Sequence, residues 1–328
     1  MIKERVVWID WAKAVLIYLM VVGHCFPVAW EDQLIYAFHM PAFFIISGYL
    51  YHPHKWWQTL RSFFVPILFF SSVNFLIYAL PKILKGTFST VHLAERMLIP
   101  FWGPGSLQEE EYIYLFPGVW FVIALLLCRL FMGDFSSFSW VRKYKYYVLF
   151  FLLGFLVIEP FLFPNNPLRP YKFYRFIPSF PFVLFGYCLK NRMDLSRISF
   201  PIAIVLMSLF VMISFWNGYT NILNYKFGHS YIVFGVNACI ASIVLYRYCV
   251  VLKDNSYVRF ISIGTMLILA MNINLKIFFN LLFEKIGLGT IITDHYVYPW
   301  ILGLLIIIAC YWPIRWLLHY CPILLGKN

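Results

Sequence analysis

The stretch from Arg5 to Tyr51 constrains this chain most, because it places ionisable side chains inside two apolar runs separated by the short acidic break Glu31-Asp32-Gln33. Four ionisable side chains lie inside the runs: Asp10, Lys13, His24 and His39. Ionisable groups are costly in a membrane-spanning helix, so each is a functional candidate. Each also has a structural alternative, namely a helix-end position for the lysine and a hydrogen-bonded packing role for the histidines.

The spacing of these residues suggests one common site. Lys13 and His24 are eleven residues apart, or about 16 Å along one helix face. Asp10 shares that face but lies too far away to orient His24, so we expect it to pair with Lys13. Two adjacent antiparallel helices would place His24 and His39 at similar depth. We expect Pro41 to bend the second helix just past His39 and to free a backbone carbonyl there.

The same stretch carries a motif: R-x-x-W-I-D-x-x-K, a histidine eleven residues later, then F-H-M-P-x-F-F-x-x-S-G-Y. Weaker echoes follow at Trp120-Phe121, Pro181-Phe182, Gly186-Tyr187 and Ile263-Gly264. In these residues the chain resembles the acyltransferase-3 family of integral membrane acyltransferases. The resemblance implies O-acylation in the inner (plasma) membrane of a bacterium. An acyl group, commonly acetyl, would pass from cytosolic acyl-CoA to a hydroxyl of a surface or lipid-linked glycan.

Composition indicates a polytopic membrane protein. The chain has 328 residues, of which 62% are hydrophobic and 12% charged, and apolar runs long enough to span a bilayer recur throughout. We predict an all-α transmembrane helical bundle with a single domain over residues 1–328, whose first run is retained rather than cleaved as a signal peptide. The ten predicted spans are 9–29, 33–51, 62–80, 113–131, 146–163, 174–189, 200–216, 230–252, 260–283 and 295–318.

Charge sets the expected topology. The net charge of +12 is explained by basic cytoplasmic loops and does not require a nucleic-acid partner. An N-terminus in the cytoplasm places most Lys and Arg inside and most carboxylates outside, and an even span count then places the C-terminus inside as well. The seven cysteines lack C-x-x-C spacing, and His52 and His54 lack a third ligand nearby. Neither disulfides nor a metal site are therefore predicted.

Acyl transfer to a hydroxyl needs a base, an oxyanion donor and a grip on the acyl-CoA. We predict that His24 is the base, because imidazole has an ordinary pKa near 6.5; an acyl-histidine intermediate is the alternative. His39 is predicted to be a second acid/base or an oxyanion donor. Lys13 stands where the family usually has arginine, so the resemblance implies a contact with CoA. The pantetheine arm would then run along the first helix toward His24.

Five further residues are predicted to support this site. Lys55 and Arg61, in the cytoplasmic loop after the second span, are expected to meet the phosphates of acyl-CoA. Ser47 is expected to line the site, or to let helices pack closely. Trp120 fits an interfacial aromatic belt or a sugar-stacking surface. Asn272 stands where many family members have a histidine, and it is expected to bond to substrate or to hold helices together.

Two outer loops have less specific roles. Loop 81–112 either folds over the outer mouth or is simply solvated. Loop 164–175 carries three cations: Arg169, Lys172 and Arg175. This cluster is expected to attract acidic glycans or lipid phosphates, and Glu159 is expected to pair with one of its members.

Two other functional classes fit parts of this pattern. A glycan transporter or flippase would also have many spans, polar residues at mid-depth and proline-bent helices. Its site would usually be distributed across an internal repeat, whereas here the ionisable residues cluster in the first two runs. A non-catalytic scaffold would not need two histidines at matched depth. Stabilisation by acyl-CoA distinguishes the enzyme from both.

Overall fold

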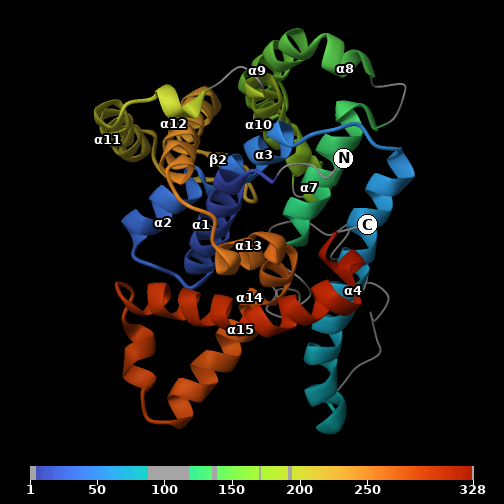
Figure 1. Cartoon of the computed structure of the whole chain (residues 1–328), viewed down its shortest axis with the longest axis vertical. Coiled ribbons are helices and arrows are strands. Elements are labelled where there is room, and N and C mark those ends of the chain that lie inside the picture. Colours follow the sequence, from blue (N-terminus) through green and yellow to red (C-terminus); the bar gives the residue numbers. More distant parts are fainter. Residues whose placement is uncertain (1–4, 88–117, 135–138, 170, 191–193, 327–328) are drawn as a thin grey trace.

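The computed structural model describes residues 5–87, 118–134, 139–169, 171–190 and 194–326. This part of the chain is almost entirely helical, which confirms the all-helical prediction (Figure 1). The α-helices are α1 (Val7–His24), α2 (Ala29–Tyr36), α3 (His39–Tyr49), α4 (Trp56–Leu84), α7 (Val119–Arg129), α8 (Ser139–Lys143), α9 (Lys145–Leu162), α10 (Phe176–Leu189), α11 (Phe200–Asn217), α12 (Tyr231–Val250), α13 (Ser256–Ile263), α14 (Thr265–Lys285) and α15 (Tyr298–Tyr320).

Short helical turns and one small hairpin complete the described part of the chain. The turns are η1 (Leu130–Asp134), η3 (Lys172–Arg175), η4 (Leu195–Arg197), η5 (Gly289–Thr293) and η6 (Pro322–Leu325). The strands β1 (Thr220–Asn221) and β2 (Lys226–Phe227) pair antiparallel, with Thr220 opposite Phe227.

The second apolar run is divided into α2 and α3. The break falls at Phe38, whose backbone (φ −147°, ψ −24°) lies outside the helical region. Pro41 is the third residue of α3, in the first turn, where proline is tolerated because no intrahelical donor is lost. The prediction that Pro41 bends the helix past His39 is therefore wrong, because the break comes before His39.

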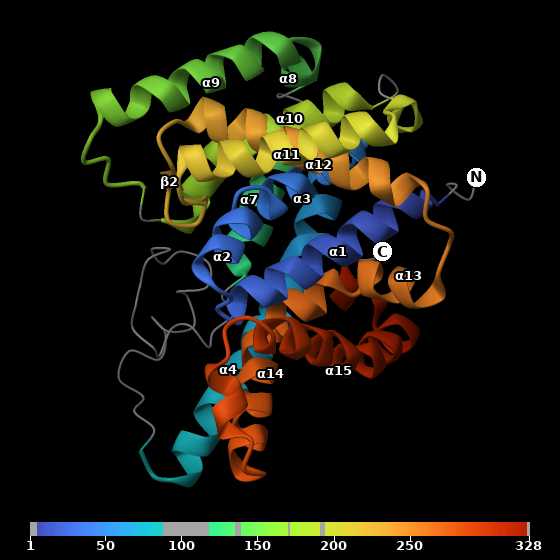
Figure 2. The same cartoon turned by 90° about the vertical axis from the view of Figure 1, so that its left-hand side faces the viewer.

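Helix α1 lies at the centre of the bundle, with α3, α12, α13, α14 and α15 packed around it (Figures 1 and 2). Its N-terminal end is tied to the segment around α13. The Trp11 indole donates to the Lys253 carbonyl at 2.8 Å, and the Arg5 guanidinium donates to the Arg259 carbonyl at 3.5 Å. These bonds fix the position of α1 along its axis, and with it the depth of every residue that follows.

Seven of the described helices are long and apolar enough to cross a membrane: α1, α4, α9, α11, α12, α14 and α15. The other predicted spans, 33–51, 113–131 and 174–189, correspond to shorter helices, namely α2 with α3, α7 and α10. The chain is therefore a multi-pass helical membrane protein. The count of ten spans and the cytoplasmic placement of both termini remain predictions.

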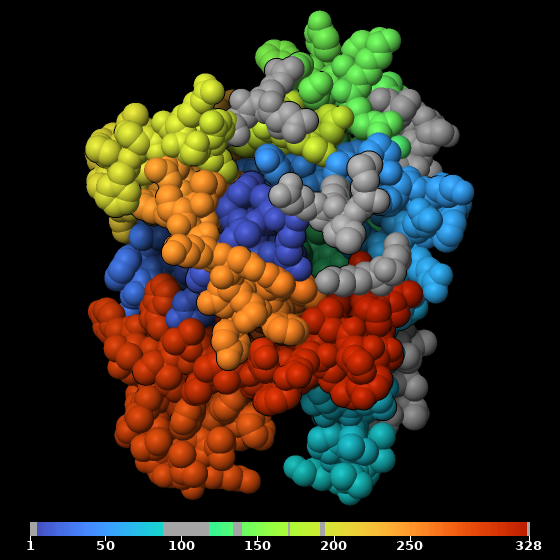
Figure 3. Space-filling model, viewed as in Figure 1, coloured from blue at the N-terminus to red at the C-terminus, as the bar shows by residue number. Residues whose placement is uncertain are grey.

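The ends of α4 and α14 extend beyond α15 as two arms, with an open space between them in Figure 3. Exposed apolar side chains cover these ends. The side chains that are more than half exposed there include Leu76, Leu80 and Leu84 on α4 and Phe278 and Leu281 on α14. So much contiguous apolar surface is unfavourable in water. It is suited to contact with lipid chains, where helices satisfy their own backbone groups.

Candidate active site

A cavity of about 390 Å³ lies beside α1, between α3, α4, α7, α14 and η6. On α1 it is lined by Lys13, Ile17 and Met20, which are spaced as one face of a helix. About 10 Å of helix separates Lys13 from Met20. The cavity is within the usual size range of small-molecule sites.

The chemistry of the lining changes along the cavity. Lys13, His54 and Arg129 contribute cationic or titratable groups, and the described lining residues include no carboxylate. The Arg129 guanidinium lies 5.6 Å from the centre of the ring of Tyr51, two residues after α3 ends. Farther along α1 and nearer the start of α3, the lining is apolar, with Met20 and Met40. The cavity can therefore hold an elongated molecule that is anionic at one end and apolar at the other.

His24 is the last residue of α1, one helical turn beyond Met20. Its Nδ1 lies 2.8 Å from Oδ1 of Asn272 on α14. The Nδ2 of Asn272 donates to the Leu269 carbonyl at 2.6 Å, which fixes the orientation of the amide. Because an amide oxygen only accepts, neutral His24 carries its proton on Nδ1 and presents Nε2 as an acceptor. A general base needs this arrangement.

Asn272 is thus joined to the predicted base itself. The alternative in which it holds helices together agrees with the structure, since the bond to His24 links α14 to α1. The predicted first span, 9–29, would place His24 five residues before the end of its helix, but α1 ends at His24. The imidazole therefore sits where the backbone turns, and a partner from another helix fixes its orientation.

Asp10 pairs with Arg5, so the predicted pair with Lys13 is wrong. Arg5 donates from Nε at 2.5 Å and from Nη2 at 2.9 Å to the two carboxylate oxygens, and Ser262 Oγ donates to one of them at 2.6 Å. A guanidinium matches both oxygens of a carboxylate, whereas an ammonium does not. Lys13 Nζ donates to the Ser262 carbonyl at 2.8 Å, from a position that lines the cavity.

His39, the first residue of α3, is 2% exposed. Its Nδ1 donates to the Ile35 carbonyl at 2.6 Å, so neutral His39 also presents Nε2 as an acceptor. The ring of Tyr36 meets the imidazole edge to face at 5.1 Å, and Tyr36 also lies against Gly23, next to His24. The structure thus brings His24 and His39 into one region.

The other predicted residues fall into different places. Ser47 lines the cavity. Lys55 lines a shallow hollow at the start of α4, and Arg61 is exposed on α4 away from the cavity lining. Trp120 is 7% exposed and packs beside Phe121, so it belongs to the core and not to an interfacial belt. Of these two aromatic residues, Phe121 lines the cavity and Trp120 does not.

Two cations near the site were not singled out in the sequence. Arg129 ends α7 and lines the cavity, but its sequence position at the end of an apolar run is typical of a loop charge. Lys276 lies inside α14, and its Nζ donates to the His24 carbonyl at 2.7 Å. The signal for Lys276 was present, since an ionisable residue inside an apolar run marks a functional candidate.

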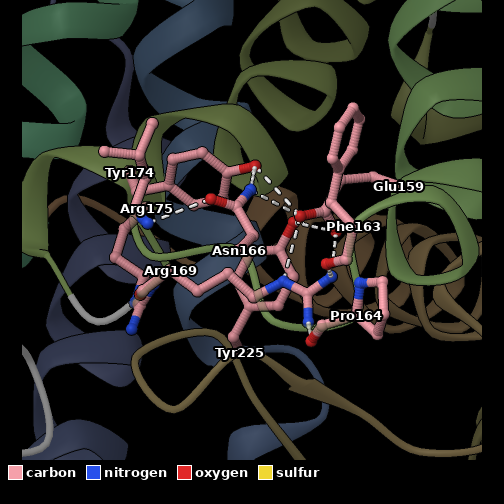
Figure 4. A network of polar contacts seen from close by, with 9 residues as sticks. Glu159, Phe163, Pro164, Asn166, Arg169, Tyr174, Arg175 and Tyr225 are labelled. Atoms are coloured by element: carbon pink, nitrogen blue, oxygen red, sulfur yellow. Dashed lines mark hydrogen bonds and ion pairs between the residues drawn. The ribbon is translucent and has the colours of Figure 1, made fainter.

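Two cations of loop 164–175, Arg169 and Arg175, are held by bonds to other protein groups. Arg169 donates from Nε and Nη2 to the two oxygens of Glu159 at 2.9 and 2.8 Å, which confirms the expected pair (Figure 4). Asn166 and Tyr174 also donate to Glu159, at 2.8 and 3.2 Å. Burial lowers the pKa of Lys172 to about 8.

Arg175 continues this network toward the hairpin. Arg175 is 2% exposed, and its guanidinium donates to the Leu223 carbonyl at 2.6 Å and to the carbonyl of Arg169. Leu223 lies between β1 and β2, so these bonds join the loop before η3 to the hairpin. Arg169 and Arg175 are therefore directed at protein groups, and the expected attraction of this cluster for acidic glycans has no support from their placement.

We expect Glu159→Gln to destabilise the protein by about 3 kcal/mol, because it leaves the Arg169 guanidinium without its counterion in a largely buried network. The melting temperature of the purified protein in detergent measures this effect. Asp194→Asn is the matched control, since its ion pair with Arg197 is exposed and should contribute little. Equal melting temperatures for the two variants would contradict the structural role of Glu159.

Metal and disulfide chemistry have no candidate residues in the described part of the chain. No group of three His, Cys, Asp or Glu side chains gathers there as metal ligands. His52 instead lies beside the Lys190 ammonium, which also donates to the Tyr51 carbonyl at 2.8 Å. All seven cysteines are free thiols.

Comparison with known protein families identifies a match over nearly the whole chain. The model of an acyltransferase domain, the acyltransferase-3 family, matches residues 6–318 and so covers nearly the whole chain. No curated protein and no solved structure matches the chain significantly. The matched region includes both histidines, the lining of the cavity on α1 and α3, and the α14 residues that contact His24. The chain therefore belongs to the acyltransferase-3 family of membrane acyltransferases.

Proposed function

We propose that this protein transfers an acyl group, acetyl in the first instance, from cytosolic acyl-CoA to a hydroxyl of a surface or lipid-linked glycan. One observation carries the proposal. His24, held by Asn272 with Nε2 as acceptor, follows the apolar end of a cavity whose other lining residues include Lys13 and Arg129. Family membership supports the acyltransferase reaction, and no observation on the described residues favours the transporter alternative.

The acyl donor suits both ends of the cavity. Acyl-CoA combines phosphates with a long, neutral pantetheine arm, so its phosphates would lie near Lys13 and Arg129 and its thioester near Met20 and Met40. This direction places the thioester one helical turn from His24. Lys55, in the hollow at the start of α4, would be available to the nucleotide, whereas Arg61 lies outside both described sites.

The reaction requires one proton to move twice. His24 Nε2 would take the proton of the acceptor hydroxyl as its oxygen attacks the thioester carbonyl. Collapse of the tetrahedral intermediate then breaks the C–S bond, and the imidazolium returns the proton to the leaving CoA thiolate. Because neutral His39 presents Nε2 as an acceptor, it suits the role of second acid/base and would donate to the oxyanion only as the imidazolium. Asn272 keeps His24 in the required tautomer throughout. An acyl-histidine intermediate would use the same Nε2 atom.

Acetyl-CoA binding tests the donor part of this proposal. We expect acetyl-CoA to raise the melting temperature of the wild-type protein. Lys13→Ala and Arg129→Ala should each weaken donor binding about 10-fold, which corresponds to roughly 1.4 kcal/mol for a lost charge-assisted contact. The measurement is the shift in melting temperature against acetyl-CoA concentration, with CoA-free buffer as reference.

Arg61→Ala is the matched control for these two variants, because Arg61 is a cation of the same cytoplasmic region that does not line the cavity. It should retain the wild-type response to acetyl-CoA. If Arg61→Ala weakens acetyl-CoA binding more than Arg129→Ala does, the donor binds on the exposed face of α4 and not in the cavity. No response in the wild type would contradict acyl-CoA as the donor.

A further inference from the structure

Lys276 places an ammonium group inside α14, one of the helices long enough to cross a membrane. A charged group is costly in such a position unless protein groups replace its water shell. Here the replacement comes from the end of α1. Lys276 Nζ donates to the His24 carbonyl at 2.7 Å and lies 3.7 Å from the centre of the Phe26 ring.

The end of α1 has a matching need for this cation. The last carbonyls of a helix lack intrahelical donors, and a positive charge at that end is favourable for the helix dipole. Directly after His24 the backbone enters a strained turn, since Phe26 has a φ of +59°, which is uncommon for a residue with a side chain. His295 Nδ1 donates to the Phe26 carbonyl at 3.0 Å. Groups from outside α1 therefore hold this turn on both sides.

Lys276 and Asn272 are four residues apart on α14, so they project from the same face of that helix. Asn272 holds the His24 ring at Nδ1, and Lys276 holds the His24 main chain at its carbonyl oxygen. We propose that Lys276 is a positioning residue that, together with Asn272, fixes both the backbone and the imidazole of His24. This inference rests on the proposed role of His24 as the base, and it adds a residue that does not touch the reacting atoms.

The reaction rate gives the first test. Lys276→Met keeps the length of the side chain and removes the donor and the charge. We expect it to lower kcat by roughly 100-fold, because a displaced base loses alignment, while the KM for acetyl-CoA stays the same. The assay uses membrane vesicles, labelled acetyl-CoA and the host's own surface glycan as acceptor. Lys276→Arg, which keeps both donor and charge, should recover most of the rate.

A control variant and a double variant distinguish a positioning role of Lys276 from a general effect on stability. Lys285→Met removes an exposed lysine from the end of the same helix and should leave kcat unchanged. In a His24→Ala background, Lys276→Met should not lower the residual rate further, because it acts through His24. An additional loss in that background, or a normal kcat for Lys276→Met, would overturn the inference.

A second measurement does not depend on activity. Cys25, next to His24, is 6% exposed in the held turn, so its labelling by a membrane-permeant maleimide reports whether the turn opens. Peptide mass spectrometry distinguishes Cys25 from the other six cysteines. The maleimide should label Cys25 at least several-fold faster in Lys276→Met than in wild type or in Lys276→Arg. Equal labelling rates in Lys276→Met and wild type would overturn the inference that Lys276 holds the turn. If Lys276→Met labels faster but the wild type transfers no acetyl group, only the proposed function is refuted.

Discussion

His24→Ala is expected to lower acyl transfer by about 10²- to 10⁴-fold, which is the range that a positioned general base contributes. The substitution removes the only group at the end of α1 that combines a fixed donor, Nδ1–H to Asn272, with a free acceptor at Nε2, among the residues the structure describes. Donor binding should survive, because His24 does not line the cavity. Acetyl-CoA should therefore still raise the melting temperature of the variant.

The decisive comparison is made in cells that express wild type and His24→Ala at equal levels. Mass spectrometry of alkali-labile acyl groups on total surface glycan counts the product. His319→Ala, on the exposed end of α15, is the matched control and should behave as wild type. Loss of one acyl species with the glycan still exported supports catalysis by His24. Loss of the glycan itself would favour the transporter, and unchanged acylation would contradict the mechanism.

Much of this site follows from local sequence periodicity. The spacing of Lys13 along α1 predicts that it shares a helix face with residues that approach His24, and the structure places Lys13, Ile17 and Met20 in one cavity wall. Ser47 lies on α3 at a position that also lines the cavity. Regular helix geometry is enough for these assignments, because each one compares residues of a single element.

Helix ends were predicted less well. Hydropathy is continuous through Cys25 to Ala29 and through Phe38, so an apolar run does not record where the backbone leaves the helix. Residues from other elements contact both points: His295 bonds to the carbonyl of left-handed Phe26, and Phe210 packs against Phe38 at the break. Tertiary contacts decide these boundaries, and a single run of sequence holds little information about them.

Partners from distant parts of the chain were the hardest to foresee. Asn272 and Lys276 contact His24 across 248 and 252 residues, and no pattern within α1 indicates which residue of α14 will face it. The same holds for Asp10, where Arg5 and Ser262 satisfy the carboxylate that seemed available to Lys13 by spacing. Spacing identifies which side chains can meet, but the competing donors are known only once helices are packed.

Gly48→Ala is expected to disrupt the fold around this site. A Cβ on Gly48 would lie 1.9 Å from the Val183 carbonyl oxygen, and a Cβ on Gly186 would lie 2.0 Å from the Ile45 carbonyl oxygen. Each clash is with backbone, so α3 and α10 must separate to relieve it. The close-packing alternative for Ser47-Gly48 therefore agrees with the structure, and the two glycines act as a reciprocal pair.

We expect Gly48→Ala and Gly186→Ala each to lower the free energy of unfolding by at least about 3 kcal/mol, the upper end of the range for overpacking. Neither backbone can shift locally to relieve the clash. Separation of the helices would also displace Ser47 and the α3 wall of the cavity, so acetyl-CoA binding should fall with stability. Melting temperature in detergent is the measurement. Gly154→Ala in α9, where a Cβ meets nothing within 4 Å, should raise stability slightly or leave it unchanged. If Gly48→Ala and Gly154→Ala have the same melting temperature, α3 and α10 are not in backbone contact. The position of α3, which carries His39, must then be fixed by other elements.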